Sequence, residues 1–290
     1  MKRPTLRIIV GIPGSGKTTF CKEHVAVNPE AVHLSSDKIR EELWGDAAVQ
    51  GDNNQVFALM HQRTLEALNN GYDVLYDATN CTRKDRASII SICPAFAKVE
   101  AHIIWAPIEE CIKRDAARER SVGKAVIDKF LKRFQAPFWD EKFTDIHIHL
   151  PHDFDIGEYD YKSTLAMDIP HDNPHHTVDI LPHCNLAGKY AMTHQFGYHV
   201  TEAALLHDLG KPYCKAFIDS KGEPCEVAHF YNHQNVSAYL YYGMHNASPE
   251  VAWLISTHMD PYLNTKYYQK LPKFLKDQVD KLHEADMAAH

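Results

Sequence analysis

The sequence has no long hydrophobic run, little cysteine and no arginine in its second half. No apolar stretch approaches the roughly 20 residues that a membrane helix needs, which excludes a membrane-spanning segment. Seven Cys, an odd number without the spacing of a disulfide framework, predict reduced thiols in a cytoplasm. The start of the chain has a glycine-rich loop where a signal peptide would have its cleavage site. We therefore expect a cytoplasmic protein with no membrane partner.

Charge and histidine are distributed unequally along the 290 residues, a length that allows one large domain or two ordinary ones. The net charge is −7, yet residues 1–146 hold 21 Lys+Arg against 20 Asp+Glu. The last of the ten arginines is Arg133, whereas sixteen of the twenty histidines follow residue 146. Arginine grips phosphates, and neutral imidazole together with carboxylate binds metal ions. Compositional drift is the alternative, but the split predicts two sites with different chemistry.

Short apolar runs alternate with helical patterns in the first half of the chain. The predicted strands are residues 6–10, 32–35, 73–76, 99–105 and 146–150, and the predicted helices lie near residues 16–26, 37–44, 53–70, 83–92, 107–120 and 124–136. This alternation predicts an α/β domain over residues 1–150, with a mainly parallel sheet and helices on both faces. Residues 151–172 are acidic, rich in turn formers and without helical periodicity, which predicts a linker or a segment that wraps around a domain. Residues 173–290 predict an all-α domain with no convincing strand.

A glycine-rich loop follows the first predicted strand. It reads Gly11-Ile-Pro-Gly-Ser-Gly-Lys-Thr18 and fits the pattern G-x-x-x-x-G-K-[ST] between a strand and a helix. The glycines let backbone N–H groups surround a phosphate, and the helix start adds its positive dipole end. Lys17 is expected to reach the β- and γ-phosphates, and Thr18 to ligate Mg²⁺. The sequence therefore predicts a site for ATP or another nucleoside triphosphate, made by Gly11, Gly14, Ser15, Gly16, Lys17, Thr18 and Thr19.

Polar residues at the end of the second strand distinguish a kinase from a hydrolase. Because the carboxyl ends of parallel strands face the ligand crevice, Asp37 is placed to accept the proton of an attacking hydroxyl. Arg40 lies one helical turn further on and is placed to hold an acceptor phosphate. The alternative is that Ser36 or Asp37 caps the following helix, which leaves the Asp–Arg pair unexplained.

Two further polar groups are expected near the same crevice. The third strand ends in Asp77, a candidate to support the bound Mg²⁺, and the polar cluster continues with Thr79, Asn80, Arg83 and Arg86. A basic run then follows the fourth strand, with Lys113, Arg114, Arg118, Arg120 and Lys124. A solvated face is the alternative for any one of these cations. Together they predict a lid that closes over the transferring phosphoryl group.

The segments GIPGSGKTT, SSDKIREELWG, DATNCTRKDR and RDAARER make residues 6–150 resemble the 5′-hydroxyl polynucleotide kinases of bacterial and phage end-healing enzymes. The resemblance implies a P-loop kinase domain in which Lys17 and Thr18 hold ATP and Mg²⁺. It also implies that Asp37 is the general base and that Arg40 contacts the acceptor phosphate. A lid arginine contacts the ATP phosphates in that family. The spacing of Arg114 and Arg118 fits this role, and Arg120 competes for it.

An adjacent histidine and aspartate, His207 and Asp208, end an apolar helical pattern in the second half. Both side chains can reach one metal ion at a helix end. Further candidate ligands are Asp286, in a late helix, and histidines at positions 176, 183, 229, 233 and 258, the last three in helical contexts. A mixture of imidazole and carboxylate suits Mn²⁺, Fe, Co²⁺, Ni²⁺ or Zn²⁺. The sequence therefore predicts a transition-metal site.

This second pattern is similar to HD-superfamily phosphohydrolases over residues 173–290. The resemblance implies four metal ligands, His183, His207, Asp208 and Asp286, with His176 as a rival first ligand or as a residue that faces the substrate. It further implies that His233 and His258 bind a second metal or the substrate phosphate, and that Lys211 follows the doublet as in the form HDxGK. Metal-dependent hydrolysis of a phosphoester is the implied reaction, because a metal lowers the pKa of water and polarises a phosphoryl oxygen.

A domain that adds a 5′ phosphate and a domain that removes a phosphate have a joint interpretation. Cleaved RNA often carries 5′-hydroxyl and 2′,3′-cyclic phosphate ends, whereas ligation needs a 5′ phosphate and a 3′ hydroxyl. The leading hypothesis is an end-healing enzyme for RNA or DNA ends, with a nucleic-acid ligase as partner, in the cytoplasm of a bacterial or phage-infected cell. A small-molecule kinase fused to a nucleotidase is the alternative. A nucleotide sensor without catalysis is a third, which the intact motif residues argue against.

Overall fold

The structure is a computed structural model that describes residues 3–46, 49, 51–174 and 177–289. The chain divides into two compact units, and each is described by itself. The first consists of Met1–Phe130 with Pro137–His152, and the second of Leu131–Ala136 with Asp153–His290. None of the helices in these described ranges has the length and hydropathy of a membrane span.

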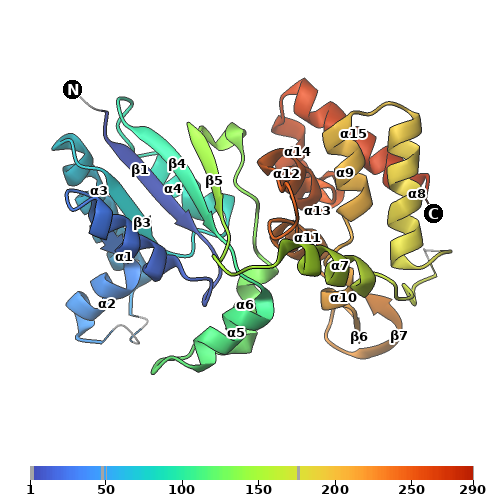
Figure 1. The fold of residues 1–290 in the computed structure, drawn as a ribbon, viewed down its shortest axis with the longest axis horizontal. Helices are drawn as coiled ribbons and strands as arrows, with labels where there is room; N and C mark the ends of the chain where they lie inside the picture. The colour runs from blue at the N-terminus through green and yellow to red at the C-terminus, as the bar shows by residue number, and fades with distance from the viewer. Residues whose placement is uncertain (1–2, 47–48, 50, 175–176, 290) are drawn as a thin grey trace. The chain divides into compact units, whose positions relative to one another are not determined.

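The first unit is built on a five-stranded sheet in which every neighbouring pair of strands is parallel (Figure 1). Its strands are β1 (Thr5–Val10), β2 (Val32–Ser35), β3 (Val74–Asp77), β4 (Lys98–Ile104) and β5 (Asp145–His149), in the spatial order β2-β3-β1-β4-β5. All five predicted strands are confirmed within one or two residues. The buried β-branched and leucine residues of β1 explain why it lies in the middle of the sheet.

Helices cover both faces of this sheet, as the alternation of strands and helices predicts. They are α1 (Lys17–Val27), α2 (Ser36–Trp44), α3 (Asn53–Asn69), α4 (Arg83–Ile90), α5 (Ile108–Ala116) and α6 (Lys124–Leu131), with a 3₁₀ turn at Trp139–Glu141. Cys21 of α1 packs against Leu75, whereas His61 of α3 lies with its ring 5.9 Å from that of Tyr76. Adjacent residues of a strand point to opposite faces, so α1 and α3 cover different sides.

The polar residues after β3 are used inside the unit, which corrects the expectation that they all open on a crevice. Asn80 is buried and its Nδ2 donates to the carbonyl of Ile9 at 2.8 Å. Arg86 is fully buried and binds the carboxylate of Glu141 through Nε and Nη2, both at 2.8 Å. Arg83 binds Asp140 at 2.8 Å. The sequence could not show this, because the carboxylates that bind the arginines lie more than fifty residues further along the chain.

Replacing Arg86 with methionine should destabilise the first unit strongly. The change leaves the carboxylate of Glu141 buried without its partner, a situation that costs about 3–5 kcal/mol. The unfolding transition of this unit in urea, followed by circular dichroism, measures the effect. Arg63→Gln, which breaks an exposed pair with Glu42, should leave that transition in place. Equal shifts for the two variants would contradict the role of the buried pair.

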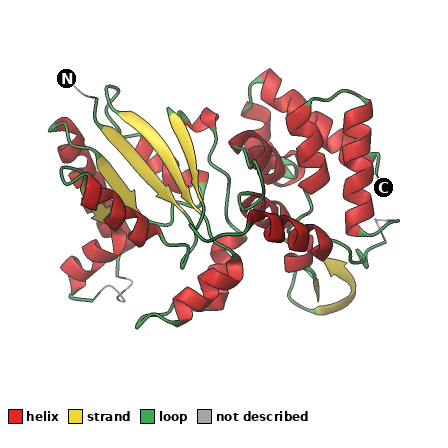
Figure 2. Cartoon of the chain, viewed as in Figure 1, coloured by secondary structure: helices red, strands yellow, loops and turns green. Residues whose placement is uncertain are grey.

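The second unit is mainly helical (Figures 1 and 2). Its helices are α7 (Ile156–Ala166), α8 (Ile180–Thr193), α9 (Tyr198–Leu206), α10 (Lys211–Cys214), α11 (His233–Tyr241), α12 (Pro249–Thr257), α13 (Asp260–Leu263), α14 (Thr265–Lys270) and α15 (Lys273–Met287). Two short antiparallel strands, β6 (Ala216–Ile218) and β7 (Pro224–His229), form a hairpin that the sequence pattern did not predict.

Helix α7 lies in the segment for which the sequence predicts a linker without helical structure. Asp155 caps its start by accepting a hydrogen bond from the backbone N–H of Glu158 at 2.9 Å. Tyr159 then ties the helix to the unit, because its hydroxyl donates to the carbonyl of Leu240 at 3.1 Å. No residue of α7 is fully buried, so the helix lacks the apolar stripe by which the sequence would show it.

Candidate functional site

The glycine-rich loop connects β1 to α1 and has a shape that only glycine allows. Gly14 and Gly16 have φ angles of 84° and 105°, in the left-handed region. A Cβ atom at Gly14 would overlap the carbonyl of Cys111, and one at Gly11 would lie 2.6 Å from the carbonyl oxygen of Ile104. The backbone of the loop can therefore approach a ligand closely, as a phosphate cradle requires.

Two side chains of the loop fit a phosphate. Ser15 is buried, and its Oγ has no hydrogen-bond partner among the residues that the structure describes. The Nζ atom of Lys17 donates to the carbonyl of Ile12 at 2.8 Å, so the ammonium group is held against the loop. Burial lowers the pKa of Lys17, and the nearby Asp77 acts in the opposite direction. A half-buried ammonium group and the Ser15 hydroxyl, which no other described residue engages, lie beside the start of α1 and suit the phosphates of a nucleotide.

Replacing Gly14 with alanine should weaken nucleotide binding by about tenfold or more. A side chain in the left-handed region costs roughly 1–2 kcal/mol, each 1.4 kcal/mol is about tenfold in affinity, and the clash with Cys111 adds to this. The affinity for ATP, measured by calorimetry, tests the expectation. Gly45 is a matched control, since its φ is 74° but a Cβ there would meet nothing within 4 Å. Gly45→Ala should keep the wild-type affinity for ATP. Equal losses of affinity in Gly14→Ala and Gly45→Ala would contradict the role assigned to the shape of the loop.

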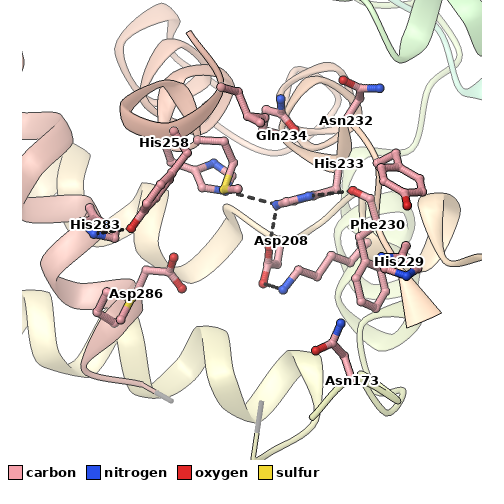
Figure 3. A pocket seen from close by; sticks show the side chains of 16 residues that line it. Asn173, Asp208, His229, Phe230, Asn232, His233, Gln234, His258, His283 and Asp286 are labelled. Carbon is pink, nitrogen blue, oxygen red and sulfur yellow. Dashed lines mark hydrogen bonds and ion pairs between the residues drawn. The ribbon is translucent and has the colours of Figure 1, made fainter. Parts of the chain in front are cut away.

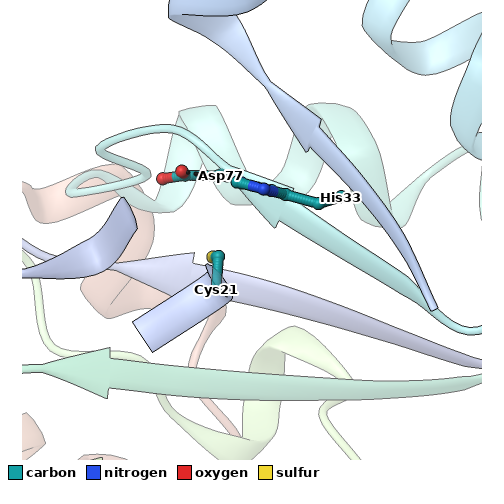
Figure 4. Close-up of side chains that lie close together, drawn as sticks. All are labelled: Cys21, His33 and Asp77. Atoms are coloured by element: carbon teal, nitrogen blue, oxygen red, sulfur yellow. Dashed lines mark hydrogen bonds and ion pairs between the residues drawn. The ribbon is translucent and has the colours of Figure 1, made fainter. Parts of the chain in front are cut away.

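Thr18, at the start of α1, faces the end of β3. Its Oγ1 donates to Oδ2 of Asp77 at 3.3 Å, and Nε2 of His33 lies 3.0 Å from the same oxygen. Figure 4 shows Asp77 and His33 with Cys21 nearby. Burial raises the pKa of the Cys21 thiol, so it remains protonated and is a poor metal ligand. Thr18 and Asp77 are therefore the pair suited to Mg²⁺, a cation that prefers oxygen. Thr19 follows on the exposed side of α1.

Asp37 and Arg40 form a pair in the first turns of α2, directly after β2. Nη1 of Arg40 donates to Oδ1 of Asp37 at 3.0 Å, and Nη2 donates to Oδ1 of Asn53 at 3.0 Å. The Asp37 side chain is 68% exposed, whereas that of Arg40 is 13% exposed. The cap of α2 is Ser35, without a side-chain cap bond, so helix capping does not explain Asp37. The sequence pattern missed Asn53, which begins the next helix and positions Arg40.

The basic run lies in and after α5, whose start packs against the glycine-rich loop. A guanidinium nitrogen of Arg114 lies 3.7 Å from the Cβ position of Gly16, and its Nε donates to Glu110 at 2.8 Å. Arg118 is exposed, and its charge acts on the pKa of Lys17. Arg120 follows two residues later, also beyond the C-terminal end of α5. Arg114 and Arg118 thus both lie near the glycine-rich loop. Lys113 instead pairs with Glu110, and Lys124 pairs with Asp128.

Four predicted ligands meet in the second unit, contributed by α8, the end of α9 and α15. Nε2 of His183 lies 3.0 Å from Oδ1 of Asp286 and 3.3 Å from Nε2 of His207. Oδ2 of Asp208 lies 3.4 Å from Nε2 of His207 and 3.7 Å from that of His183. All but Asp286 are almost completely buried. These spacings are close to those of atoms that share one metal ion.

A second group shares Asp208 with the first (Figure 3). Oδ1 of Asp208 lies 3.2 Å from Nε2 of His233, which lies 3.2 Å from Nε2 of His258. The two carboxylate oxygens of Asp208 thus face different sets of imidazoles. Burial and the neighbouring histidines lower the pKa of His258 to about 3, so this imidazole is neutral, the form that binds a metal.

The histidines of both groups have the same orientation. The Nδ1 atoms of His183, His207, His233 and His258 lie 2.7–3.3 Å from backbone carbonyl oxygens. A carbonyl only accepts, so each Nδ1 carries a proton and each Nε2 points to the centre, where it can offer its lone pair to a metal ion. Burial works to lower the pKa of His207, but Asp208 and Asp286 raise it, which shows that the carboxylates favour a positive charge there. The donor set therefore fits a transition-metal ion.

Lys211 and His171 lie beside the Oδ2 atom of Asp208. Nζ of Lys211 lies 2.7 Å from Oδ2 of Asp208 and 3.0 Å from Nε2 of His171. His171 is buried, and sequence reasoning missed it because it lies in the predicted linker. His176, the rival first ligand, lies outside the described residues. His229 ends β7 rather than lying in a helix, and its ring stacks on that of Tyr231.

A pocket of about 410 Å³ opens beside the two groups. Asp208, Asp286, His233 and His258 line it, and Figure 3 shows them around the cavity. The remainder of its wall includes Lys211 and the aromatic residues Phe230, Tyr231 and Tyr262. A pocket of this kind, with convergent polar groups and aromatic walls, suits a small ligand or the end of a larger one.

Several known proteins resemble about half of the chain each. The curated transcription factor bHLH140 of Arabidopsis thaliana is 26% identical over 146 residues, 48% of this chain but only 15% of that protein. The solved Pnkp1/Rnl/Hen1 RNA repair complex matches at 24% identity and a TM-score of 0.42, over 46% of this chain and 44% of the other. A fungal RNA kinase matches at 18% identity and a TM-score of 0.39, over 51% and 38%.

Two family models match the chain in regions that agree with the geometry. The model of the AAA domain family AAA_33 matches residues 6–137, which contain the glycine-rich loop, the Asp37–Arg40 pair and the basic run. The model of the HD domain matches residues 183–286, the interval between the first and last of the four predicted ligands. The chain therefore joins a P-loop domain of the AAA_33 type to an HD domain.

Proposed function

We propose that the chain is a bifunctional enzyme that heals nucleic-acid ends, phosphorylating 5′-hydroxyl ends with ATP and removing 2′,3′-cyclic, 2′ or 3′ phosphates. The observation that supports the proposal is the presence of two separate sites, one in each unit, whose residues suit phosphate chemistry. One has a glycine-rich loop with an Asp37–Arg40 pair nearby, and the other has imidazoles and carboxylates beside a pocket.

For the kinase reaction, the proposed roles follow from the positions of the side chains. The loop and Lys17 hold the ATP phosphates, and Thr18 with Asp77 holds Mg²⁺. Asp37 accepts the proton of the 5′ hydroxyl as its oxygen bonds to the γ-phosphorus and the bond to ADP breaks. Arg40, held by Asn53, binds the acceptor phosphate, and Arg114, Arg118 or Arg120 neutralises charge on the transferring group.

For the phosphohydrolase reaction, His183, His207, Asp208 and Asp286 hold a transition metal. When bound, the metal lowers the pKa of water and polarises the phosphoryl oxygen. His233 and His258 hold a second metal or the substrate phosphate, and Lys211 keeps Asp208 ionised and oriented through the 2.7 Å contact. The aromatic residues of the pocket wall contact the terminal nucleotide.

The proposed pair of reactions converts the ends of cleaved RNA into ends that a ligase can join, so we propose a nucleic-acid ligase as partner and a cytoplasmic location. The net charge of −7 does not favour tight binding along a nucleic-acid chain, but it is compatible with recognition of its ends.

The test is incubation with RNA that carries 5′-hydroxyl and 2′,3′-cyclic phosphate ends, with ATP and with Mg²⁺, Mn²⁺ or Ni²⁺. Both ends should change in the wild type, and His207→Ala should lose only the change at the 3′ end. If neither end changes in any metal, the proposal is wrong.

A small-molecule kinase fused to a nucleotidase remains the second candidate, because the pocket would also accept a free nucleotide. A series of acceptors from a nucleoside to a 12-mer separates the two. End healing predicts that kcat/KM for 5′ phosphorylation rises with acceptor length, whereas a nucleoside or sugar kinase loses activity. Absence of any turnover by the metal-replete protein would instead favour a non-catalytic sensor.

A further inference from the structure

A cluster of histidines and a carboxylate lies in the first unit, on the neighbouring strands β4 and β5. It includes Glu100 and His102 of β4 and His147 of β5. Glutamate is mostly exposed in proteins and histidine is buried less often than apolar residues, so such a group is unusual in a sheet. Each of the three offers one ligand atom, and these atoms lie within 4.8 Å of one another. Neither of the proposed reactions uses this cluster.

Strand pairing brings the three residues to one face of the sheet. In the parallel register of β4 and β5, His102 lies directly beside His147, and Glu100 beside Asp145. Residues two apart on a strand share a face, so Glu100 and His102 point to the same side. Figure 1 shows β5 next to β4, at the edge of the sheet. The cluster thus ties the edge strand to its neighbour.

The distances allow the three side chains to share one cation. Nε2 of His102 lies 3.3 Å from Oε2 of Glu100, and the rings of His102 and His147 have centroids 4.7 Å apart. Ligand atoms around a tetrahedral zinc ion are about 3.3 Å apart. His147 and Glu100 have to turn toward the ion. The side chain of His147 is 40% exposed and can move, whereas that of His102 is 8% exposed and stays in place.

Neighbouring residues prepare His102 as a ligand. Nδ1 of His102 lies 3.0 Å from Nε2 of His149, so His149 can accept a hydrogen bond from the Nδ1–H group of His102. Nε2 of His102 then faces Glu100. A second residue that fixes the tautomer is typical of histidines that bind metals. The ring of Phe20, from α1, lies 5.6 Å from that of His102 and 4.5 Å from that of His149, and partly excludes water.

Arg7 is the cation that already contacts Glu100, through Nε at 3.4 Å. The same arginine also binds Asp73 through Nη1 at 3.1 Å. Asp73 can therefore keep Arg7 in place when Glu100 turns toward a metal. Asp145, whose Oδ2 lies 3.5 Å from Nε2 of His147, adds a further carboxylate at the exposed side.

We propose that Glu100, His102 and His147 form a structural site for a divalent first-row transition metal such as Zn²⁺, which clamps β5 to β4. A set of two imidazoles and one carboxylate suits such an ion better than it suits Mg²⁺ or Ca²⁺, which prefer oxygen ligands. Because the ligands are brought together only by the folded sheet, the ion stabilises the folded first unit.

The experiment uses the full chain with the HD ligands removed by His183→Ala and Asp208→Ala, so that binding in the second unit does not mask the site. Zn²⁺ affinity is measured by competition with a chromophoric chelator. We expect one tight site, which the additional change His147→Asn weakens at least about tenfold. Zn²⁺ should also raise the melting temperature of the parent but not of this variant.

The matched control is His152→Asn, which removes an exposed histidine just after β5. It should leave the Zn²⁺ affinity unchanged. The proposal is overturned if His147→Asn binds Zn²⁺ as tightly as its parent, or if His152→Asn loses as much affinity. If the HD changes prevent folding, the metal content of the otherwise wild-type chain decides instead, since His147→Asn should lower it by one ion and an unchanged content overturns the proposal.

Discussion

In the proposed phosphohydrolase reaction, the Asp208→Asn variant should lose activity by about 1000-fold or more, because it weakens the hold on the metal that activates water. Asp208 contacts both groups of imidazoles, with Oδ2 3.4 Å from His207 and Oδ1 3.2 Å from His233. The amide of asparagine offers one neutral oxygen and cannot provide negative charge to both groups of imidazoles. Release of phosphate from a 3′-phosphorylated oligonucleotide, followed with the metal content of the purified chain, measures the effect.

A graded comparison makes this prediction specific. His258→Ala removes a side chain from the second group alone, so it should lower activity less and leave the first group able to bind metal. Asp277→Asn makes the same chemical change at an exposed pair with Lys281 on α15 and should have no effect. The 5′ kinase activity of all three variants should remain within about twofold of wild type, because the two sites lie in separate units. Full phosphatase activity of Asp208→Asn would refute the shared role of this carboxylate.

The Asp37→Asn variant should lose 5′ kinase activity by about 10²–10⁴-fold, the usual contribution of a general base. The amide preserves the size of the side chain but cannot take the proton of the attacking hydroxyl. Because Asp37 lies on α2 rather than in the glycine-rich loop, the KM for ATP should change little while kcat falls. Transfer of labelled γ-phosphate to a 5′-hydroxyl oligonucleotide gives both constants.

Helix α2 offers a close control for Asp37. Glu42 is also an exposed carboxylate paired with an arginine, Arg63, but it does not follow the end of β2. Glu42→Gln should therefore keep the wild-type kinase rate. Equal labelling by Asp37→Asn and the wild type would remove Asp37 from the mechanism. Equal losses in Asp37→Asn and Glu42→Gln would indicate that the integrity of α2, and not a proton transfer, is responsible.

Much of the fold was predictable because its signals are local. The strands of the first unit are short apolar runs, and their predicted positions agree with β1–β5. Helix α7 and the β6–β7 hairpin were not predictable in this way. Helix α7 depends on a cap at Asp155 and on hydrogen bonds with residues far along the chain, from Tyr159 to Leu240 and from His245 to Asp160. Of the hairpin strands, β6 has only three residues and β7 is largely exposed or half-buried, so neither forms an apolar run.

For the sites, the sequence by itself determined the residues whose chemistry depends on their immediate neighbours. The glycine-rich loop and the His207–Asp208 doublet belong to this class, since a tight turn and a helix end place their groups. Tertiary structure alone decided which distant side chains meet. It brought His171 to Lys211, buried Arg86 against Glu141, made Asp208 common to two groups and placed His102 beside His147. Such contacts depend on strand register and helix packing, which residue order does not display.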